Sequence, residues 1–240
     1  MSRCTRLAAA LAAASCLCWA GLDLSSALAQ YDEQTPTQKP GFQSPEGFGF
    51  EFRLGPFKPT DNVVFEEVFS DSGPMLATEL DIHAHRLPEI GVASVGLGLG
   101  WARYEAGACQ VETCQGMRLE EKTTLRLVPF SLLAVARLDA LPRRFGVPLV
   151  LTAKLGYEWV LWDTATGGVD DASGVSPGFR WALQLAFDLG VFQPRSARML
   201  DEEWGINLSF LFLELYGSTA EGDSLPVGGE SWAAGLGFLF

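Results

Sequence analysis

The chain has 240 residues, enough for one domain of ordinary size. Its 17 basic and 29 acidic side chains give a formal net charge of −12, which argues against nucleic acid as a partner. After the N-terminal segment no apolar run reaches the roughly eighteen residues of a membrane-spanning helix, so no such helix is expected.

Residues 1–29 have the three parts of a secretory signal peptide. Arg3 and Arg6 give a positive start, residues 7–20 are apolar, and residues 27–29 (Ala-Leu-Ala) fit a cleavage site. A lipoprotein would acylate Cys16 or Cys18, but neither has Leu three positions before it. We therefore expect export and a mature chain that begins near Gln30, with 15 basic and 28 acidic side chains once Arg3, Arg6 and Asp23 are removed.

Residues 30–46 are polar and contain three Pro, which predicts a disordered lead-in. From residue 47 the sequence alternates with a period of two. Phe50 and Phe52 share one face with other large apolar residues, while Glu51 and Arg53 share the other face with glycines. This pattern predicts a β-strand over residues 47–55.

Seven further segments alternate in the same way. They predict strands over residues 79–85, 93–102, 123–138, 149–161, 179–188, 206–216 and 231–240. Pro129 inside the fourth strand predicts a β-bulge. Eight strands are favoured over ten, and residues 47–240 are expected to form one domain.

The polar face of these strands is unusual, because it holds mostly Gly, Ala and Ser with a few charges. A soluble sandwich would place Lys, Glu and Thr on its outer face. Small residues fit a narrow enclosed interior, and the bulky apolar face fits lipid. The sequence therefore predicts an all-β fold, an eight-stranded antiparallel up-and-down transmembrane barrel.

The links between the strands support an orientation for this barrel. Residues 104–122 and 163–177 are expected to form long outer loops, whereas residues 139–146 form a shorter periplasmic link. Residues 191–205 predict a short periplasmic helix with Pro194 near its start and Gly205 at its end. Both ends of the barrel chain are then periplasmic.

The last strand resembles the terminal strand of Gram-negative outer-membrane barrels, whose aromatic C-terminal residue is read by the barrel-assembly machinery. Trp232, Leu236, Phe238 and Phe240 match that pattern. Residues 50–57 (FEFRLGPF), 128–139 (VPFSLLAVARLD) and 197–206 (ARMLDEEWGI) resemble an outer-membrane β-barrel family of myxobacterial genomes. The resemblance implies a barrel in the outer membrane and no chemistry. We expect a monomer whose partners are outer-membrane lipid and the barrel-assembly machinery.

The charges that face inward are the main candidate site. A set of this kind could act as a selectivity filter, or it could form a salt-bridge network that plugs the lumen. We favour the network, because an unpaired charge in a narrow lumen is costly. The residues are Glu51, Arg53, Glu79, Asp81, Lys154, Glu158, Arg180, Asp188 and Glu214.

The two histidines, His83 and His85, share a strand face with Glu79 and Asp81. Residues two apart can bind a metal together, but we expect only a polar lining of the lumen and no metal or cofactor. A lipid-modifying enzyme would need a His that faces lipid beside a Ser and an acid. Because both histidines are predicted to face inward, we expect no catalytic residues.

Two other features have simple structural explanations. Cys109 and Cys114 remain after signal cleavage, and their spacing predicts a disulfide that staples a loop rather than a redox pair. Five aromatic residues are expected to form an interfacial girdle rather than a ligand site: Trp101, Tyr157, Trp159, Trp162 and Trp232.

Three functions remain open from the sequence. The first is a non-catalytic outer-membrane barrel with a structural or surface-interaction role and a largely plugged lumen. The second is a narrow conduit or binding barrel for a small or hydrophobic solute. The third is a lipid-modifying outer-membrane enzyme.

Overall fold

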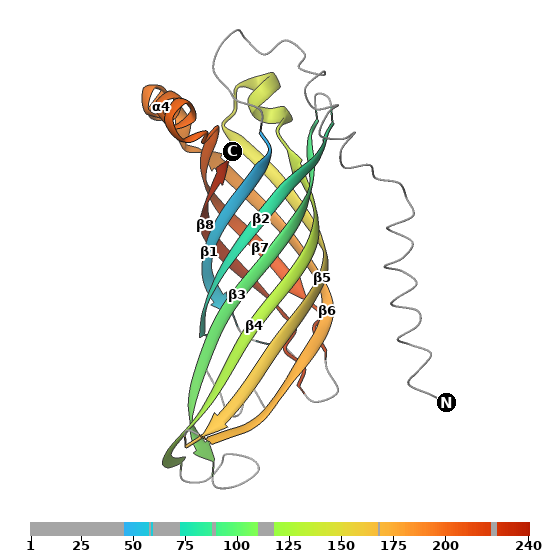
Figure 1. Ribbon diagram of the computed structural model, residues 1–240, viewed down its shortest axis with the longest axis vertical. Coiled ribbons are helices and arrows are strands. Elements are labelled where there is room, and N and C mark those ends of the chain that lie inside the picture. The colour runs from blue at the N-terminus through green and yellow to red at the C-terminus, as the bar shows by residue number, and fades with distance from the viewer. Residues whose placement is uncertain are drawn as a thin grey trace, which may run out of the picture. The chain divides into compact units, whose positions relative to one another are not determined.

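The computed structural model describes residues 46–240 except 58, 60–72, 88–89, 110–117, 168 and 222–224. The predicted signal peptide and residues 30–45 of the lead-in lie outside the described residues. Eight antiparallel strands close into one barrel in chain order (Figure 1). They are β1 (Phe48–Phe57), β2 (Gly73–Leu87), β3 (Gly91–Cys109), β4 (Arg118–Leu138), β5 (Leu149–Thr166), β6 (Val169–Asp188), β7 (Leu208–Ser218) and β8 (Gly229–Leu239).

The ring closes where β1 pairs with β8, from Gly49 opposite Leu239 to Leu54 opposite Ala234. Each other strand pairs with the next one along the chain. The predicted eight-stranded up-and-down barrel is therefore confirmed, and the described residues contain no further strand.

The polarity of the barrel is inverted relative to a soluble protein, as the alternation predicted. On β1, Glu51 and Arg53 are 0 % and 2 % exposed, while Phe50 and Phe52 are 39 % and 44 % exposed. The outer faces of all eight strands carry exposed Leu, Val, Ile or aromatic side chains. Such a continuous apolar wall is the surface that a transmembrane barrel presents to lipid.

The glycines on the inner face of β8 make room for rings from β7. A Cβ added at Gly237 would lie 2.2 Å from Cζ of Phe210, and one at Gly235 would lie 2.5 Å from Cζ of Phe212. Both distances are far below van der Waals contact. Small residues are therefore required where the narrow interior must hold large neighbours.

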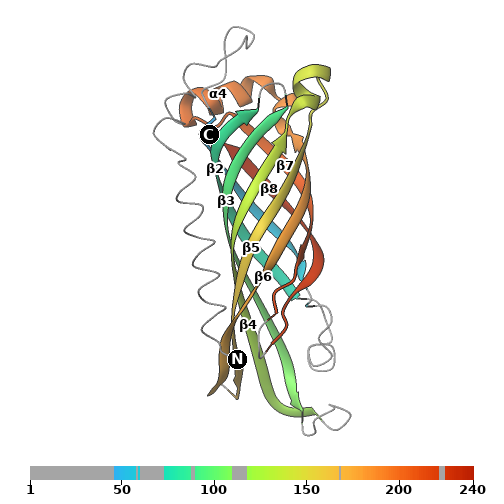
Figure 2. The ribbon, with the colours of Figure 1, turned by 90° about the vertical axis from the view of Figure 1, so that its right-hand side faces the viewer.

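One end of the barrel, here called the helical end, carries the helices and the C-terminus (Figures 1 and 2). The predicted helix is confirmed as α4 (Pro194–Trp204), which ends at Gly205 in the left-handed conformation, φ 68°. Two short helices were not expected, η1 (Leu141–Phe145) and η2 (Leu189–Val191). None of the helices in the described ranges is long and apolar enough to cross a membrane.

The opposite end, here called the ribbon end, differs from the prediction. Strands β3 to β6 have 19, 21, 18 and 20 residues, whereas β1 has 10 and β7 and β8 have 11. Much of the predicted outer loops, 104–122 and 163–177, is therefore strand. The alternation fades in these segments because Thr, Ser, Ala and Gly occupy both faces. Polarity then no longer distinguishes a strand from a loop.

The predicted bulge at Pro129 is wrong. Pro129 pairs with Val160 on β5 without a register shift, and only the ladder to β3 lapses beside it. This is consistent with its missing N–H. The bulges lie instead at residues 83–85, 107–109 and 164–165.

Candidate functional site: the filled lumen

The centre of the lumen is occupied by one lysine among three carboxylates. Nζ of Lys154 on β5 lies 2.6 Å from Glu51 on β1, 2.7 Å from Glu79 on β2 and 3.1 Å from Glu214 on β7. All four side chains are at most 1 % exposed. Four strands therefore send charged groups to one buried cluster inside the barrel.

Arg53 shares the same carboxylates. Its guanidinium donates to Glu79 and to Glu214, and it lies 3.6 Å from Glu51. Gln184 on β6 adds a hydrogen bond from its amide to Glu51, at 3.0 Å. These charge-assisted contacts compensate for the removal of the charges from water.

A second pair flanks this centre toward the ribbon end. Nη1 of Arg180 donates to Glu158 at 2.6 Å, and the hydroxyl of Ser218 donates to the other oxygen of Glu158 at 2.6 Å. The guanidinium also lies over the ring of Tyr216, 4.7 Å from its centroid. Another Nη of Arg180 lies 3.9 Å from Glu214, which links this pair to the centre.

Toward the helical end, the cation is Arg137 on β4. It lies 3.9 Å from Glu51, 4.0 Å from Asp81 and over the ring of Phe210 at 5.4 Å. Asp81 is 1 % exposed, and neither of its oxygens has a hydrogen-bond partner in the described part of the chain. The cluster thus holds four cations and five acids, and Asp81 is the most weakly paired of them.

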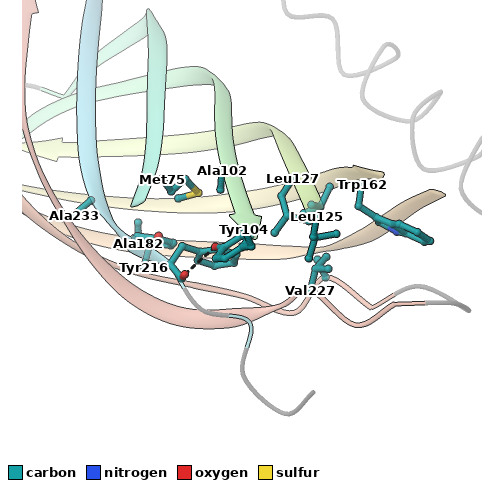
Figure 3. Close-up of a cluster of buried hydrophobic side chains, with 13 residues drawn as sticks. Met75, Ala102, Tyr104, Leu125, Leu127, Trp162, Ala182, Tyr216, Val227 and Ala233 are labelled. Atoms are coloured by element: carbon teal, nitrogen blue, oxygen red, sulfur yellow. Dashed lines mark hydrogen bonds between the residues drawn. The ribbon is translucent and has the colours of Figure 1, made fainter. Parts of the chain in front are cut away.

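Apolar side chains close the lumen on both sides of the charges. Toward the ribbon end, Figure 3 shows Met75, Leu127 and Tyr216 packed inside the barrel. The segment after β7 contributes Ala220 and Val227, both 1 % exposed or less. Toward the helical end the cluster is Val150, Ala186, Phe210, Phe212 and Leu239.

A cavity of about 10 Å³ remains beside Arg180 and Glu158, room for about one water molecule. The charged groups and the two apolar clusters occupy the interior along the described strands. An eight-stranded barrel is expected to have a bore that side chains alone can fill.

Eight of the nine predicted lumen charges lie in this cluster. They are Glu51, Arg53, Glu79, Asp81, Lys154, Glu158, Arg180 and Glu214. The structure adds Arg137 and Gln184, which the sequence analysis missed. The sequence does hold a signal for Arg137, because it lies an even number of residues from Ser131 and so on the same face of β4. Apolar residues on both faces of β4 made the inner face hard to identify.

Asp188 is the exception, and its expected place in the network is wrong. It ends β6 at the helical end, where its carboxylate accepts a hydrogen bond of 2.7 Å from the N–H of Gly190. The same rim holds Arg86, which lies 3.4 Å from Asp139. Burial raises the pKa of Asp139, although the charge of Arg86 opposes this shift. The rim therefore has contacts of its own, separate from the lumen network.

The expectation that both histidines face the lumen holds for His83, which pairs with the buried Ser94, and is wrong for His85. His83 is partly buried, and its Nδ1 lies 3.2 Å from the carbonyl oxygen of Glu46. The bulge between residues 83 and 85 shifts the register, so His85 pairs with Ala93 on the outer face and is exposed. In the described ranges His85 has no hydrogen bond or ion pair, and no cluster of His, Cys, Asp or Glu could hold a metal.

The aromatic residues divide into two groups. Trp101, Tyr157 and Trp232 are exposed on the outer wall, and Trp159 packs between Tyr157 and Phe130 with ring centroids 5.6 and 6.0 Å apart. Trp162 is 8 % exposed and belongs to the inner apolar cluster, so its expected place in the girdle is wrong.

The remaining predicted residues lie near the strand ends. Phe240 stacks on Phe48, with ring centroids 4.7 Å apart and planes 9° apart. Along β8, Trp232 and Leu236 are exposed, and Phe238 is half-buried. Cys109 ends β3, but Cys114 lies outside the described residues, so the predicted disulfide stays a prediction.

Comparison with solved structures finds small barrels of bacterial membranes. The chain is similar to Neisserial surface protein A, at 12 % identity over 81 % of this chain and 97 % of that one, TM-score 0.46. It is similar to Ail, the attachment invasion locus protein of Yersinia pestis, at 10 % identity over 81 % and 97 %, TM-score 0.42. The translocator domain of the autotransporter NalP from Neisseria meningitidis matches at 13 % identity over 95 % and 98 %, TM-score 0.33.

These similarities are weak, and the barrel topology rests on the strand pairing of this chain. No family model matches the sequence, and no curated protein matches it. The resemblance to a myxobacterial barrel family therefore stays a prediction.

Proposed function

We propose that this chain is a non-catalytic, non-conducting outer-membrane barrel that holds a four-stranded sheet outside the cell. Its role is then structural or one of surface interaction. The observation that carries the proposal is the filled lumen, in which Lys154 and Glu51 from opposite walls are 2.6 Å apart. A conduit would need an open bore at this level.

The residues on the outer surface support a location in the membrane and suggest the level of its outer boundary. On β3, β4 and β5 the aromatic side chains Trp101, Phe130 and Trp159 are followed, two or four residues further toward the ribbon end, by Arg103, Arg126 and Asp163 on the same face. Arg126 and Asp163 form an exposed ion pair at 3.5 Å. Aromatic residues favour the membrane interface and charged pairs favour water, so the boundary falls between the two rows.

Beyond this boundary four strands continue as one sheet. Ladder pairing between β2 and β3 extends only to Ala102, and pairing between β6 and β7 begins at Arg180. The ladders from β3 to β6 run on, to Arg118 opposite Cys109 and Val169 opposite Thr166. This sheet is the part of the described chain that a surface partner could reach, and we infer that it is extracellular.

The predicted signal peptide and the C-terminal pattern of Trp232, Leu236, Phe238 and Phe240 support export and assembly in the outer membrane. We propose a monomer, assembled by the barrel-assembly machinery, with the helical end in the periplasm.

Cysteine labelling of intact cells tests location and orientation together. In a Cys109→Ser/Cys114→Ser background, Lys122→Cys places a thiol on the sheet and Glu202→Cys places one on α4. An impermeant maleimide should label Lys122→Cys in whole cells and Glu202→Cys only after lysis. Recovery of the protein as a soluble periplasmic species, or the reverse labelling pattern, would contradict the proposal.

A further inference from the structure

Three aromatic side chains at the helical end are more exposed than any other large apolar residue that the structure describes. Phe145 in η1 is 73 % exposed, Phe192 after η2 is 74 % exposed and Trp204 at the end of α4 is 71 % exposed, whereas other such residues reach at most 55 %. They come from separate segments of the chain. Large aromatic side chains this exposed on one rim indicate a surface that is covered by something apolar.

We propose that α4, together with Phe145 and Phe192, is an interfacial anchor that binds the glycerophospholipid surface of the inner leaflet. The proposal rests on the proposed membrane location and goes beyond it, because it assigns a lipid-binding role to an element outside the barrel wall.

The rim is continuous with the lipid-facing wall. Phe192 packs on Phe187, with ring centroids 5.5 Å apart and an interplanar angle of 37°. Phe187 lies in register with Leu149 on β5 and Leu211 on β7, in the outer row of the barrel. The apolar wall therefore extends past the last strand residues onto the turn that leads into α4.

The helix has the direction that an interfacial helix needs. Figure 1 shows α4 projecting beyond the barrel wall, and Figure 2 shows it lying across the barrel end rather than along the axis. A barrel whose strands cross the bilayer would then hold α4 close to the membrane plane. Its position at the end of the wall would place it at headgroup depth.

The sequence of α4 is amphipathic, but the protein buries none of its side chains. At helical spacing Ala197, Leu200 and Trp204 share one face, while Arg198 and Glu202 lie on the opposite face. Isolated helices of fewer than roughly 12 residues are marginal in water. A helix of 11 residues without a buried face needs a further surface, and lipid beside the wall supplies one.

Tryptophan quenching by brominated lipid tests the anchor. The full mature chain is reconstituted in phosphatidylcholine vesicles whose acyl chains carry bromine either near the headgroup or near the methyl end. Subtracting the emission of Trp204→Phe from that of the unmodified protein isolates the signal of Trp204. Trp162→Phe, which removes a buried lumen residue, and Trp232→Phe, which removes a residue of the barrel wall, provide matched controls.

We expect the Trp204 signal to be blue-shifted and quenched, and more strongly by bromine near the headgroup than by bromine near the methyl end. The Trp162 signal should be quenched less than that of Trp204 by either lipid. Quenching of Trp232 without quenching of Trp204 would overturn the anchor and leave the membrane location intact, with the helix free to meet a periplasmic protein. Absence of quenching at both sites would overturn the membrane location itself.

Discussion

Lys154 on β5 and Glu51 on β1 meet across the barrel, with 2.6 Å between Nζ and a carboxylate oxygen. The two strands are four steps apart in either direction around the closed ring, so the contact joins opposite walls. Two side chains therefore span the whole bore. A solute that passed this level would have to break the contact and the hydrogen bonds around it.

The first prediction concerns the stability of this centre. Replacing Lys154 with Met should lower the free energy of unfolding by about 3–5 kcal/mol. The change leaves three buried carboxylates with Arg53 as their nearest cation, because Arg137 and Arg180 lie 3.9 Å from Glu51 and Glu214. Equilibrium unfolding in urea, with the barrel in detergent micelles, measures the change. Lys122→Met is the matched control: its side chain is 72 % exposed, and its loss should have little effect. Equal stability of the two variants would contradict the network.

The second prediction concerns Asp81, the most weakly paired of the five buried acids in the lumen. Asp81 has only Arg137 within ion-pair range, at 4.0 Å, and its oxygens lack hydrogen bonds among the described residues. Asp81→Asn should therefore leave the free energy of unfolding unchanged or raise it. Glu79→Gln should lower it, because Glu79 accepts a hydrogen bond from Arg53 and forms an ion pair with Lys154, 2.7 Å from its Nζ. A loss of more than about 1 kcal/mol for Asp81→Asn, the size of an ordinary hydrogen bond, would show that Asp81 is well paired.

The sequence alone predicted the strands wherever one face is exposed and apolar and the other faces the lumen. On β1 every second residue changes environment, so Phe50 and Glu51 reveal both the strand and its faces. Toward the ribbon end this contrast disappears, and the parts of β3 to β6 that lie there were predicted as loops. The same limit applied to the candidate site. Charges were predicted on strands whose polarity alternates clearly, whereas Arg137, which has apolar neighbours on both faces of β4, was missed.

Local irregularities were beyond reach of the alternation. The bulge at residues 83–85 reverses the face of His85. No residue in that segment is a sequence signal for a bulge, whereas Pro129 on β4 predicted one. Pro129 fits in β4 without a bulge. Its missing N–H affects the ladder on one side of the strand, and the ladder to β5 stays in register. Trp162 was assigned to the girdle by residue type, although its parity with Glu158 placed it inside.

The third prediction concerns closure of the barrel. The N–H of Phe240 donates to the carbonyl of Phe48 at 2.9 Å, and the two rings stack. Deleting Phe240 or replacing it with Asp should reduce accumulation in the outer membrane, because the change disturbs both the β1–β8 closure and the assembly pattern. Phe179→Asp on β6 is the control and should cause a smaller loss. Immunoblots of membrane fractions measure this, and normal accumulation of the deletion would refute the role of Phe240.

The fourth prediction concerns the two cysteines of the mature chain. Cys109 and Cys114 should be oxidised in the purified protein, which titration of free thiols under denaturing conditions tests. Because the closed loop is short, reduction should cost at most about 2–3 kcal/mol. Two reactive thiols in the unreduced protein would rule the staple out.

The most direct test of the filled lumen is conductance in a planar bilayer. The purified barrel should insert and show no stable single-channel current. Lys154→Ala, which removes the group between three carboxylates, should at most add a small leak, and Lys122→Ala should add none. A well-defined, cation-selective open channel in the unmodified protein would contradict the plugged lumen and favour a conduit.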